Sequence, residues 1–180
     1  MSVHLGILQT DSVLEDLQPR FGDYPQMFEG LFREQDPGMT FTTYNVQHAL
    51  PDNLECDAYL ITGCKLSVYD DLPWIRELAR FVRQAIEAKK KILGICFGHQ
   101  LIAHFFGGEA GPASAGWGVG VQTNDLVMTH GWMGDVNQIP SQLHLVASHK
   151  DQVLKLPEGA EVFASSDFCP VSGFTLGDEV

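Results

Sequence analysis

Apolar runs alternate with amphipathic segments along the first 108 residues of the chain. Short apolar runs bounded by glycine or polar residues are typical of β-strands, whereas apolar residues three or four positions apart are typical of helices. Four strands are predicted, at Val3–Leu8, Met39–Val46, Ala58–Thr62 and Ile92–Ile95. This alternation predicts an α/β fold with a doubly wound, mostly parallel sheet.

Three helices are predicted between and after these strands. The first begins near Asp23, where Gln26 stands three residues later as a capping-box partner. The second follows a start signal at Pro73 and carries a single apolar stripe. The members of that stripe are Trp74, Ile75, Leu78, Phe81, Val82, Ala85 and Ile86. The third helix follows the fourth strand at once, from about Gly98 to Phe106.

The pattern changes after residue 108. Residues Gly111–Gly120 are rich in Gly, Ala, Ser and Pro, and short β-like pieces follow them. These pieces are Val119–Val121, Leu143–Ala147 and Glu161–Ala164. They predict a small antiparallel extension of the α/β fold. We expect residues 1–180 to form a single domain, because this length suits one core.

Composition and charge narrow the functional classes. The net charge is −12, which disfavours binding to nucleic acid or to an anionic membrane. No apolar run is long enough to cross a bilayer, and the start of the chain lacks a signal-peptide pattern. Four scattered cysteines show neither a metal-type spacing nor the density of a disulfide scaffold. We therefore expect a cytoplasmic protein without a metal or another cofactor.

A strand-to-helix junction carries the candidate chemistry. The run Gly94–Gln100 (Gly-Ile-Cys-Phe-Gly-His-Gln) joins the fourth strand, predicted to be covered on both faces, to the third helix. Cys96 stands at the junction, with a glycine two residues away on either side. Glycine is needed there because a tight, strained turn leaves little room for Cβ atoms. The turn predicts that the Cys96 thiol lies at the carboxyl edge of the sheet, where open α/β folds bind ligands.

We interpret Cys96 as a nucleophile. The helix that follows directs its N-terminus at Cys96, and its N–H groups and dipole favour the thiolate over the thiol. The N–H of Phe97 then lies where it can donate to an oxyanion, as the residue after an elbow nucleophile does. The alternative is a buried and inert cysteine, which is common in protein cores.

The junction resembles the G-[VIL]-C-x-G-[HM]-Q elbow of the class I glutamine amidotransferases. The resemblance extends from Val3 to Asp178. It is strongest to stand-alone bacterial members and plant γ-glutamyl peptidases, and it includes the glutaminase domain of GMP synthase. It implies a flavodoxin-like sheet and a cysteine that cleaves the γ-amide of glutamine, or of a γ-glutamyl compound, through a thioester. It also implies that Gln100 contacts the substrate.

Two further blocks carry the resemblance. Residues Ile61–Val68 are similar to the family's S-G-[GS]-P-x-S-[VP] loop, which implies that Gly63 or Cys64 donates a second N–H to the oxyanion. Lys65 stands where that loop has proline. Residues Ala147–Val153 are similar to the family's [NS]-H-x-D-x-V segment, whose backbone helps to hold the glutamine α-amino and α-carboxylate groups. Its members here are Ser148, His149 and Lys150.

One departure concerns proton transfer. The family completes its triad with a His-Pro-Glu motif, and no His-x-Glu follows Cys96 in this chain. A cysteine nucleophile needs a base and an acid for the leaving group. We therefore expect a chain cut short before this motif, as a fragment or as a natural truncation. His149, with Asp151 two residues later, is an alternative base.

Three functions remain open. The first is a glutaminase that acts on a small molecule and passes ammonia to a separate synthase chain. The second is a γ-glutamyl peptidase that needs no partner, and the third is a non-catalytic binding or regulatory protein. Another α/β family with a cysteine elbow usually carries an acidic residue on the first strand, which Val3–Leu8 lacks.

Overall fold

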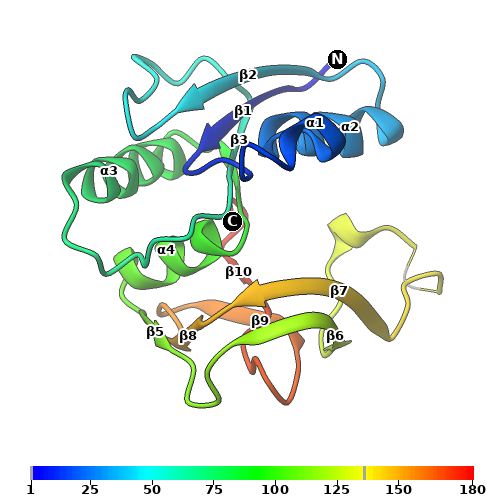
Figure 1. The fold of residues 1–180 in the computed structure, drawn as a ribbon. Helices are drawn as coiled ribbons and strands as arrows, with labels where there is room; N and C mark the ends of the chain where they lie inside the picture. Colours follow the sequence, from blue (N-terminus) through cyan, green and yellow to red (C-terminus); the bar gives the residue numbers. More distant parts are fainter. Residues whose placement is uncertain (1, 136) are drawn as a thin grey trace. The chain divides into compact units, whose positions relative to one another are not determined.

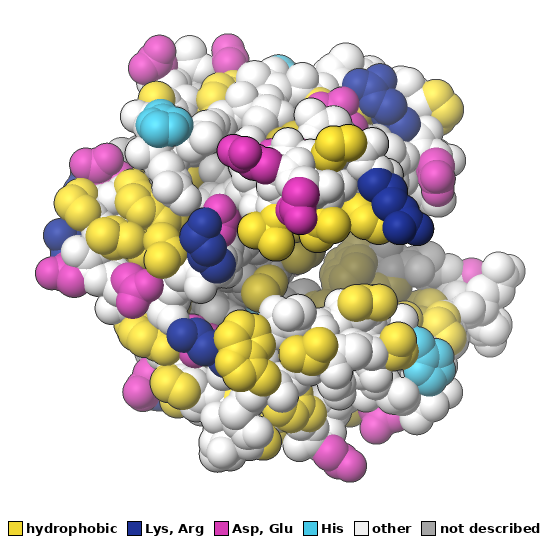
Figure 2. Space-filling model, viewed as in Figure 1, with side chains coloured by type: hydrophobic (Ala, Val, Ile, Leu, Met, Phe, Trp, Pro, Cys, Tyr) yellow, Lys and Arg dark blue, Asp and Glu magenta, His cyan; other side chains and the backbone are white. Residues whose placement is uncertain are grey.

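The computed structural model describes residues 2–135 and 137–180, which divide into two compact units. The first unit runs to Ile102 and includes Glu179–Val180, and the second is Ala103–Asp178. Figure 2 shows acidic side chains scattered over the visible face, in keeping with the net charge of −12. None of the helices in the described part of the chain combines the length and apolar character that crossing a lipid bilayer demands.

The first unit is built on a four-stranded parallel sheet (Figure 1). Its strands are β1 (His4–Gln9), β2 (Thr40–Asn45), β3 (Ala58–Ile61) and β4 (Lys91–Gly94). The strand order is β2-β1-β3-β4, so the chain winds from β1 outward in both directions. The order agrees with the doubly wound, flavodoxin-like sheet predicted from the sequence.

Helices cover both faces of this sheet. They are α1 (Gln18–Phe21), α2 (Tyr24–Gln35), α3 (Pro73–Glu87) and α4 (Phe97–Phe105). Phe28 of α2 packs against a buried cluster that includes Leu60 of β3. Phe81 of α3 meets Tyr59 edge to face, with ring centroids 5.1 Å apart. Because Tyr59 and Leu60 are neighbours in one strand, they point to opposite faces, and so the two helices lie on opposite sides.

The start of α2 forms as predicted. The Asp23 side chain accepts from the N–H of Tyr24, and a full capping box joins Asp23 to Gln26. Such a cap satisfies N–H groups that have no partner within the helix.

The prediction that the fourth strand is covered on both faces is wrong. Ile92 of β4 is buried, but Leu93 is 39% exposed and the adjacent Ile95 is 40% exposed. The helix α3 contacts β4, whereas α2 packs on β1, two strands away in the sheet. Beside β4 the main chain returns at Glu179, whose oxygen accepts from the Ile92 N–H at 2.7 Å.

The second unit is built from antiparallel strands, as the short β-like pieces after residue 108 predict. One sheet has the order β10-β9-β6-β7, and a two-stranded sheet pairs β5 with β8. The strands are β5 (Glu109–Pro112), β6 (Gly118–Leu126), β7 (Gln142–His149), β8 (Asp151–Lys155), β9 (Ala160–Ser165) and β10 (Gly173–Leu176). A short 3₁₀ turn, η1 (Gly131–Met133), lies between β6 and β7. The three predicted pieces lie in β6, β7 and β9.

Candidate active site

Cys96 lies between the end of β4 at Gly94 and the start of α4 at Phe97. Its backbone has φ of 52°, in the left-handed region that side chains other than glycine rarely adopt. Such a conformation costs an L residue about 1–2 kcal/mol and persists only where the surroundings enforce it. Cys96 is exposed and not in a disulfide. The turn thus presents a thiol to solvent at the carboxyl end of the parallel sheet.

The two elbow glycines are required by close backbone contacts. A Cβ atom on Gly94 would lie 2.6 Å from the carbonyl carbon of Gly98 and 2.7 Å from the nitrogen of His99. A Cβ atom on Gly98 would lie 2.7 Å from the main-chain oxygen of Ile61. Real Cβ atoms do not approach backbone atoms so closely, so α4 can begin here only because both positions are glycine.

Main-chain donors flank the thiol. Gly98 donates its N–H to the Ile95 oxygen at 2.9 Å, whereas the Phe97 N–H has no partner among the described residues. The Phe97 ring is buried and stacks on Trp74 at 5.6 Å between centroids, which fixes this residue in place. On the other side, a Cβ atom on Gly63 would lie 3.6 Å from the Cys96 Cβ atom. The turns after β3 and β4 are therefore adjacent.

The turn after β3 is tied to the end of β1. The buried Thr10 hydroxyl lies 2.8 Å from the Gly63 oxygen and 3.0 Å from the Thr62 hydroxyl. The Thr10 N–H donates to that same Thr62 hydroxyl at 3.0 Å. Buried polar groups are retained only when they are hydrogen-bonded, so this cluster fixes the position of Gly63 relative to β1.

Asp23 in turn fixes the segment after β1. Its carboxylate accepts from the side-chain amide of Gln9 and from the N–H of Val13, each at 2.8 Å. Burial acts to raise the pKa of Asp23, but hydrogen bonds from Val13, Tyr24, Ser12 and Gln9 outweigh it and hold that pKa below its usual value.

Tyr24 lies within electrostatic reach of Cys96. Burial raises the pKa of the Tyr24 phenol, and the neighbouring Asp11 carboxylate, together with the Cys96 sulfur when it is ionised, raises it further. The phenol, which is neutral at pH 7 even without this shift, thus holds its proton more firmly and can donate a hydrogen bond. Tyr24 stands out in the sequence only as an apolar position of α2.

The remaining predicted site residues lie in both units. Gln100 is buried in α4, and its N–H donates to the Cys96 oxygen at 3.0 Å. Ser148 and Lys150 are exposed in the second unit, and His149 is half-buried there. The His149 Nδ1 atom lies 3.0 Å from the main-chain oxygen of Asp151. The structure thus brings Gly63, Cys64, Phe97 and Gln100 together around Cys96 within the first unit.

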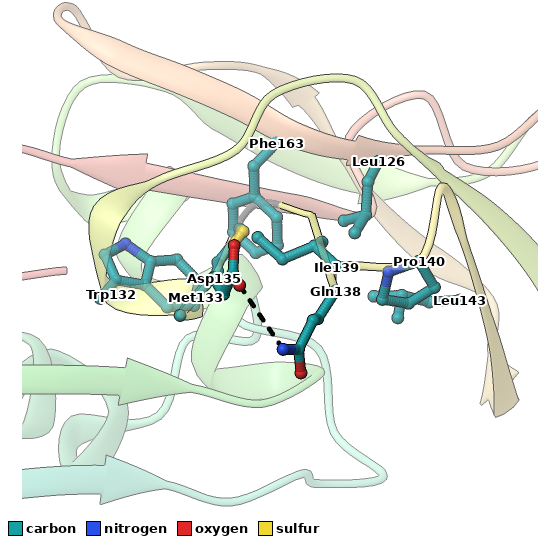
Figure 3. Close-up of a pocket in the computed structure, with 10 residues that line it drawn as sticks. Leu126, Trp132, Met133, Asp135, Gln138, Ile139, Pro140, Leu143 and Phe163 are labelled. Carbon is teal, nitrogen blue, oxygen red and sulfur yellow. Dashed lines mark hydrogen bonds between the residues drawn. The ribbon is translucent and has the colours of Figure 1, made fainter.

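The second unit also contains a mainly apolar cavity of about 530 Å³ (Figure 3). It is lined by Leu126, Trp132, Met133, Gly134, Asp135, Gln138, Ile139, Pro140, Leu143 and Phe163. None of the predicted site residues lines it. Within residues 2–135 and 137–180, no group of three or more His, Cys, Asp or Glu side chains is arranged to hold a metal ion.

Comparison with known proteins settles the family. A family model for glutamine amidotransferase class-I matches residues 32–177. The chain belongs to the class I glutamine amidotransferases. This amidotransferase-family chain is 34% identical to γ-glutamyl peptidase 3 of Arabidopsis thaliana, over 91% of the chain and 68% of that relative. It is 40% identical to a glutamine-hydrolyzing GMP synthase subunit from Methanocaldococcus jannaschii, over 55% of the chain and 50% of the relative.

Solved glutamine amidotransferases share the fold. The structure from Thermotoga maritima matches with a TM-score of 0.80 at 19% identity, covering 98% of this chain and 73% of its own. The structure from Methylobacillus flagellatus matches at 0.77 and 21% identity, covering 99% of this chain and 67% of its own. The amidotransferase-family chain covers 65% of the length of γ-glutamyl peptidase 5 from Arabidopsis thaliana. It thus spans about two thirds of the length of such relatives.

Sequence reasoning missed three residues that the structure places around Cys96 in this family member: Thr10, Asp11 and Tyr24. One signal was present for two of them. Thr10 and Asp11 directly follow an apolar strand, and the residues after the strands of a parallel sheet gather at one edge. Tyr24 carried no such signal, because its position depends on the path of the segment between β1 and α2, which includes α1.

Proposed function

We propose that this chain is a γ-glutamyl hydrolase in which the Cys96 thiolate attacks the carbonyl carbon of a γ-glutamyl amide. One observation carries the proposal: Cys96 is an exposed thiol in a left-handed turn between β4 and α4. Backbone strain of this kind clusters at functional sites, and a helix N-terminus favours a thiolate, so both features support a nucleophilic role for Cys96.

The attack creates an oxyanion that needs hydrogen-bond donors. The N–H groups of Phe97, Gly63 and Cys64 have no partner within the described part of the chain, and their residues flank Cys96. Each correctly placed donor contributes about 3 kcal/mol to the stability of such a transition state. We assign the oxyanion site to Phe97 together with Gly63 or Cys64.

The reaction then proceeds in two halves. The carbon–nitrogen bond breaks, ammonia or an amine leaves with a proton, and a thioester remains on Cys96. Water attacks the thioester, releasing glutamate and restoring the thiol. Within the first unit, we assign substrate contact to Gln100. The reaction uses only acid–base and nucleophilic chemistry.

The relatives favour a γ-glutamyl peptide as substrate. The chain is similar over most of its length to proteins named γ-glutamyl peptidases. A second candidate is a glutaminase that serves a separate synthase chain, and the similarity to the GMP synthase relative favours it. Turnover of γ-glutamyl dipeptides by the chain alone would support the peptidase. Turnover of glutamine only upon addition of a synthase would support the second.

The decisive experiment replaces Cys96 by alanine. We expect loss of all γ-glutamyl hydrolysis and of the thioester adduct in intact-protein mass spectra, with an unchanged melting temperature or a slightly higher one. Cys169→Ala is the matched control, because Cys169 is buried in the second unit and takes no part in the reaction. Full activity in Cys96→Ala would overturn the proposal.

A further experiment concerns the proton. No His-x-Glu follows Cys96 within the chain, so no such motif can protonate the leaving amine, and we expect the 180-residue protein to hydrolyse γ-glutamyl amides very slowly or not at all. The measurement is the steady-state rate of amine release from a γ-glutamyl dipeptide. Fast turnover that is lost in His149→Ala would identify His149 as the base.

A further inference from the structure

In the turn after β3, some backbone N–H groups are hydrogen-bonded within the protein and others are not. The N–H groups of Lys65, Leu66 and Ser67 each donate to a side-chain atom of the protein, at 3.1, 3.4 and 3.0 Å. The two N–H groups before them, those of Gly63 and Cys64, have no partner among the described residues. The side chains around the turn therefore decide which of its donors remain open beside Cys96.

Asp11 makes the first of these contacts. Its Oδ2 atom accepts from the Lys65 N–H, and its Oδ1 atom lies 3.4 Å from the Lys65 ammonium. The Asp11 side chain is only 14% exposed, whereas that of Lys65 is 78% exposed. An ion pair with so exposed a lysine adds little, so the bond to the main chain is the contact that holds the turn.

The Cys64 thiol joins the same arrangement. Its sulfur accepts from the Leu66 N–H at 3.4 Å and lies 3.8 Å from Asp11 Oδ2. Burial, together with the nearby Asp11 charge, raises the pKa of this thiol to about 11. Cys64 therefore keeps its proton at pH 7 and can donate it to the Asp11 carboxylate.

We infer that Asp11 is a positioning residue for the proposed oxyanion site: it holds the Lys65 N–H and the Cys64 thiol, so that the Gly63 and Cys64 N–H groups stay open beside Cys96. Lys65 makes such a restraint necessary, because a lysine leaves φ unrestricted where a proline would fix it. The inference rests on the proposed function, since it assigns a purpose to donors that only an oxyanion would use.

Two reagents that alkylate Cys96 separate the positioning of donors from thiol reactivity. A chloromethyl ketone built on the γ-carboxyl of L-glutamate reacts through a tetrahedral adduct with an oxyanion, and the sulfur then displaces chloride. Iodoacetamide loses iodide in a direct displacement and forms no oxyanion. The ratio of the two rates, measured by mass spectrometry at Cys96, reports on the oxyanion donors and is insensitive to stability alone.

We expect Asp11→Ala to lower the chloroketone rate by about 10- to 100-fold, because misaligned donors lose much of their effect. The iodoacetamide rate should stay the same. Asp11→Asn should restore most of the chloroketone rate, because its amide oxygen can still accept the Lys65 N–H. Asp16→Ala, at an exposed acid in the same segment, is the matched control and should behave as wild type.

A second pair of variants covers the case in which Asp11→Ala does not fold. Cys64→Ala should lower the rate ratio, and Cys64→Ser should retain most of it, because a hydroxyl can both accept and donate. If wild type reacts with the chloroketone and neither Asp11→Ala nor Cys64→Ala changes the ratio, the positioning role is wrong. If iodoacetamide labels wild-type Cys96 and the chloroketone does not, the proposed function itself is wrong.

Discussion

The turns after β3 and β4 lie side by side at one edge of the parallel sheet, yet different forces shape them. The elbow around Cys96 is shaped by its own backbone, because Gly94 and Gly98 allow main-chain atoms to meet at distances that no Cβ atom permits. The turn at Gly63 is shaped by side chains from another strand, chiefly Thr10 and Asp11. The first is a local solution, and the second depends on residues about 50 positions away.

The largest effect should come from filling the elbow. Gly94→Ala places a Cβ atom against the Gly98 and His99 main chain, so the backbone must move. We expect a loss of about 3 kcal/mol in the free energy of unfolding, measured in urea. Gly30→Ala is the matched control, because a Cβ atom there meets nothing within 4 Å inside α2 and should stabilise the protein. Equal stability of the two variants would contradict the steric account of the elbow.

A smaller loss of stability should follow when the hydrogen bonds between Thr10 and the turn after β3 are removed. Thr10→Val keeps the shape of the side chain but removes the hydroxyl from its buried cluster. The loss should be about 1–2 kcal/mol, because the Gly63 oxygen loses its 2.8 Å donor and keeps only the Thr62 hydroxyl at 3.3 Å. The exposed Thr40 at the start of β2 offers a control, and Thr40→Val should change stability little. A Thr10→Val protein as stable as wild type would show that the turn does not depend on β1.

Next comes the residue that holds the end of β1. Asp23→Ala removes an N-cap and should cost about 1 kcal/mol at pH 7. The folded-state pKa of Asp23 lies below its unfolded value, so its stabilisation is complete above that value and is lost as pH falls through the folded pKa. The stability difference between wild type and variant should therefore shrink below about pH 3.8. A difference that stays constant down to pH 2 would contradict the assigned role of this carboxylate.

The smallest effect on stability should come from the glycine of the turn. A Cβ atom on Gly63 would meet the Cys96 Cβ atom at 3.6 Å, an ordinary contact, and Gly63 does not adopt a positive φ. Gly63→Ala should therefore change the free energy of unfolding by less than about 0.5 kcal/mol. The added methyl group should nevertheless slow chloroketone labelling of Cys96, because it occupies space beside the sulfur. A large loss of stability would mean that the two turns share more than this one contact.

The same contrast explains what the sequence could predict. The strands, the capping box at Asp23 and the glycines around Cys96 are encoded within a few neighbouring residues, and the structure contains them where they were expected. The contacts of Thr10 and Asp11 with the turn are not local, because they exist only once β1 and β3 are paired. The exposure of Leu93 was missed for a related reason: an apolar run does not reveal which helix reaches its far face.

At Cys96 the left-handed backbone lowers the stability of the fold, whereas the cysteine side chain supplies the reactive thiol. Glycine would adopt this conformation without the cost of about 1–2 kcal/mol that an L side chain incurs. A Cys96→Gly protein should therefore be more stable than wild type while lacking its thiol. A substitution of Cys96 by glycine therefore stabilises the fold and removes the thiol. Without selection for the thiol, such a substitution would be retained, and the protein would keep its fold but lose its reactivity.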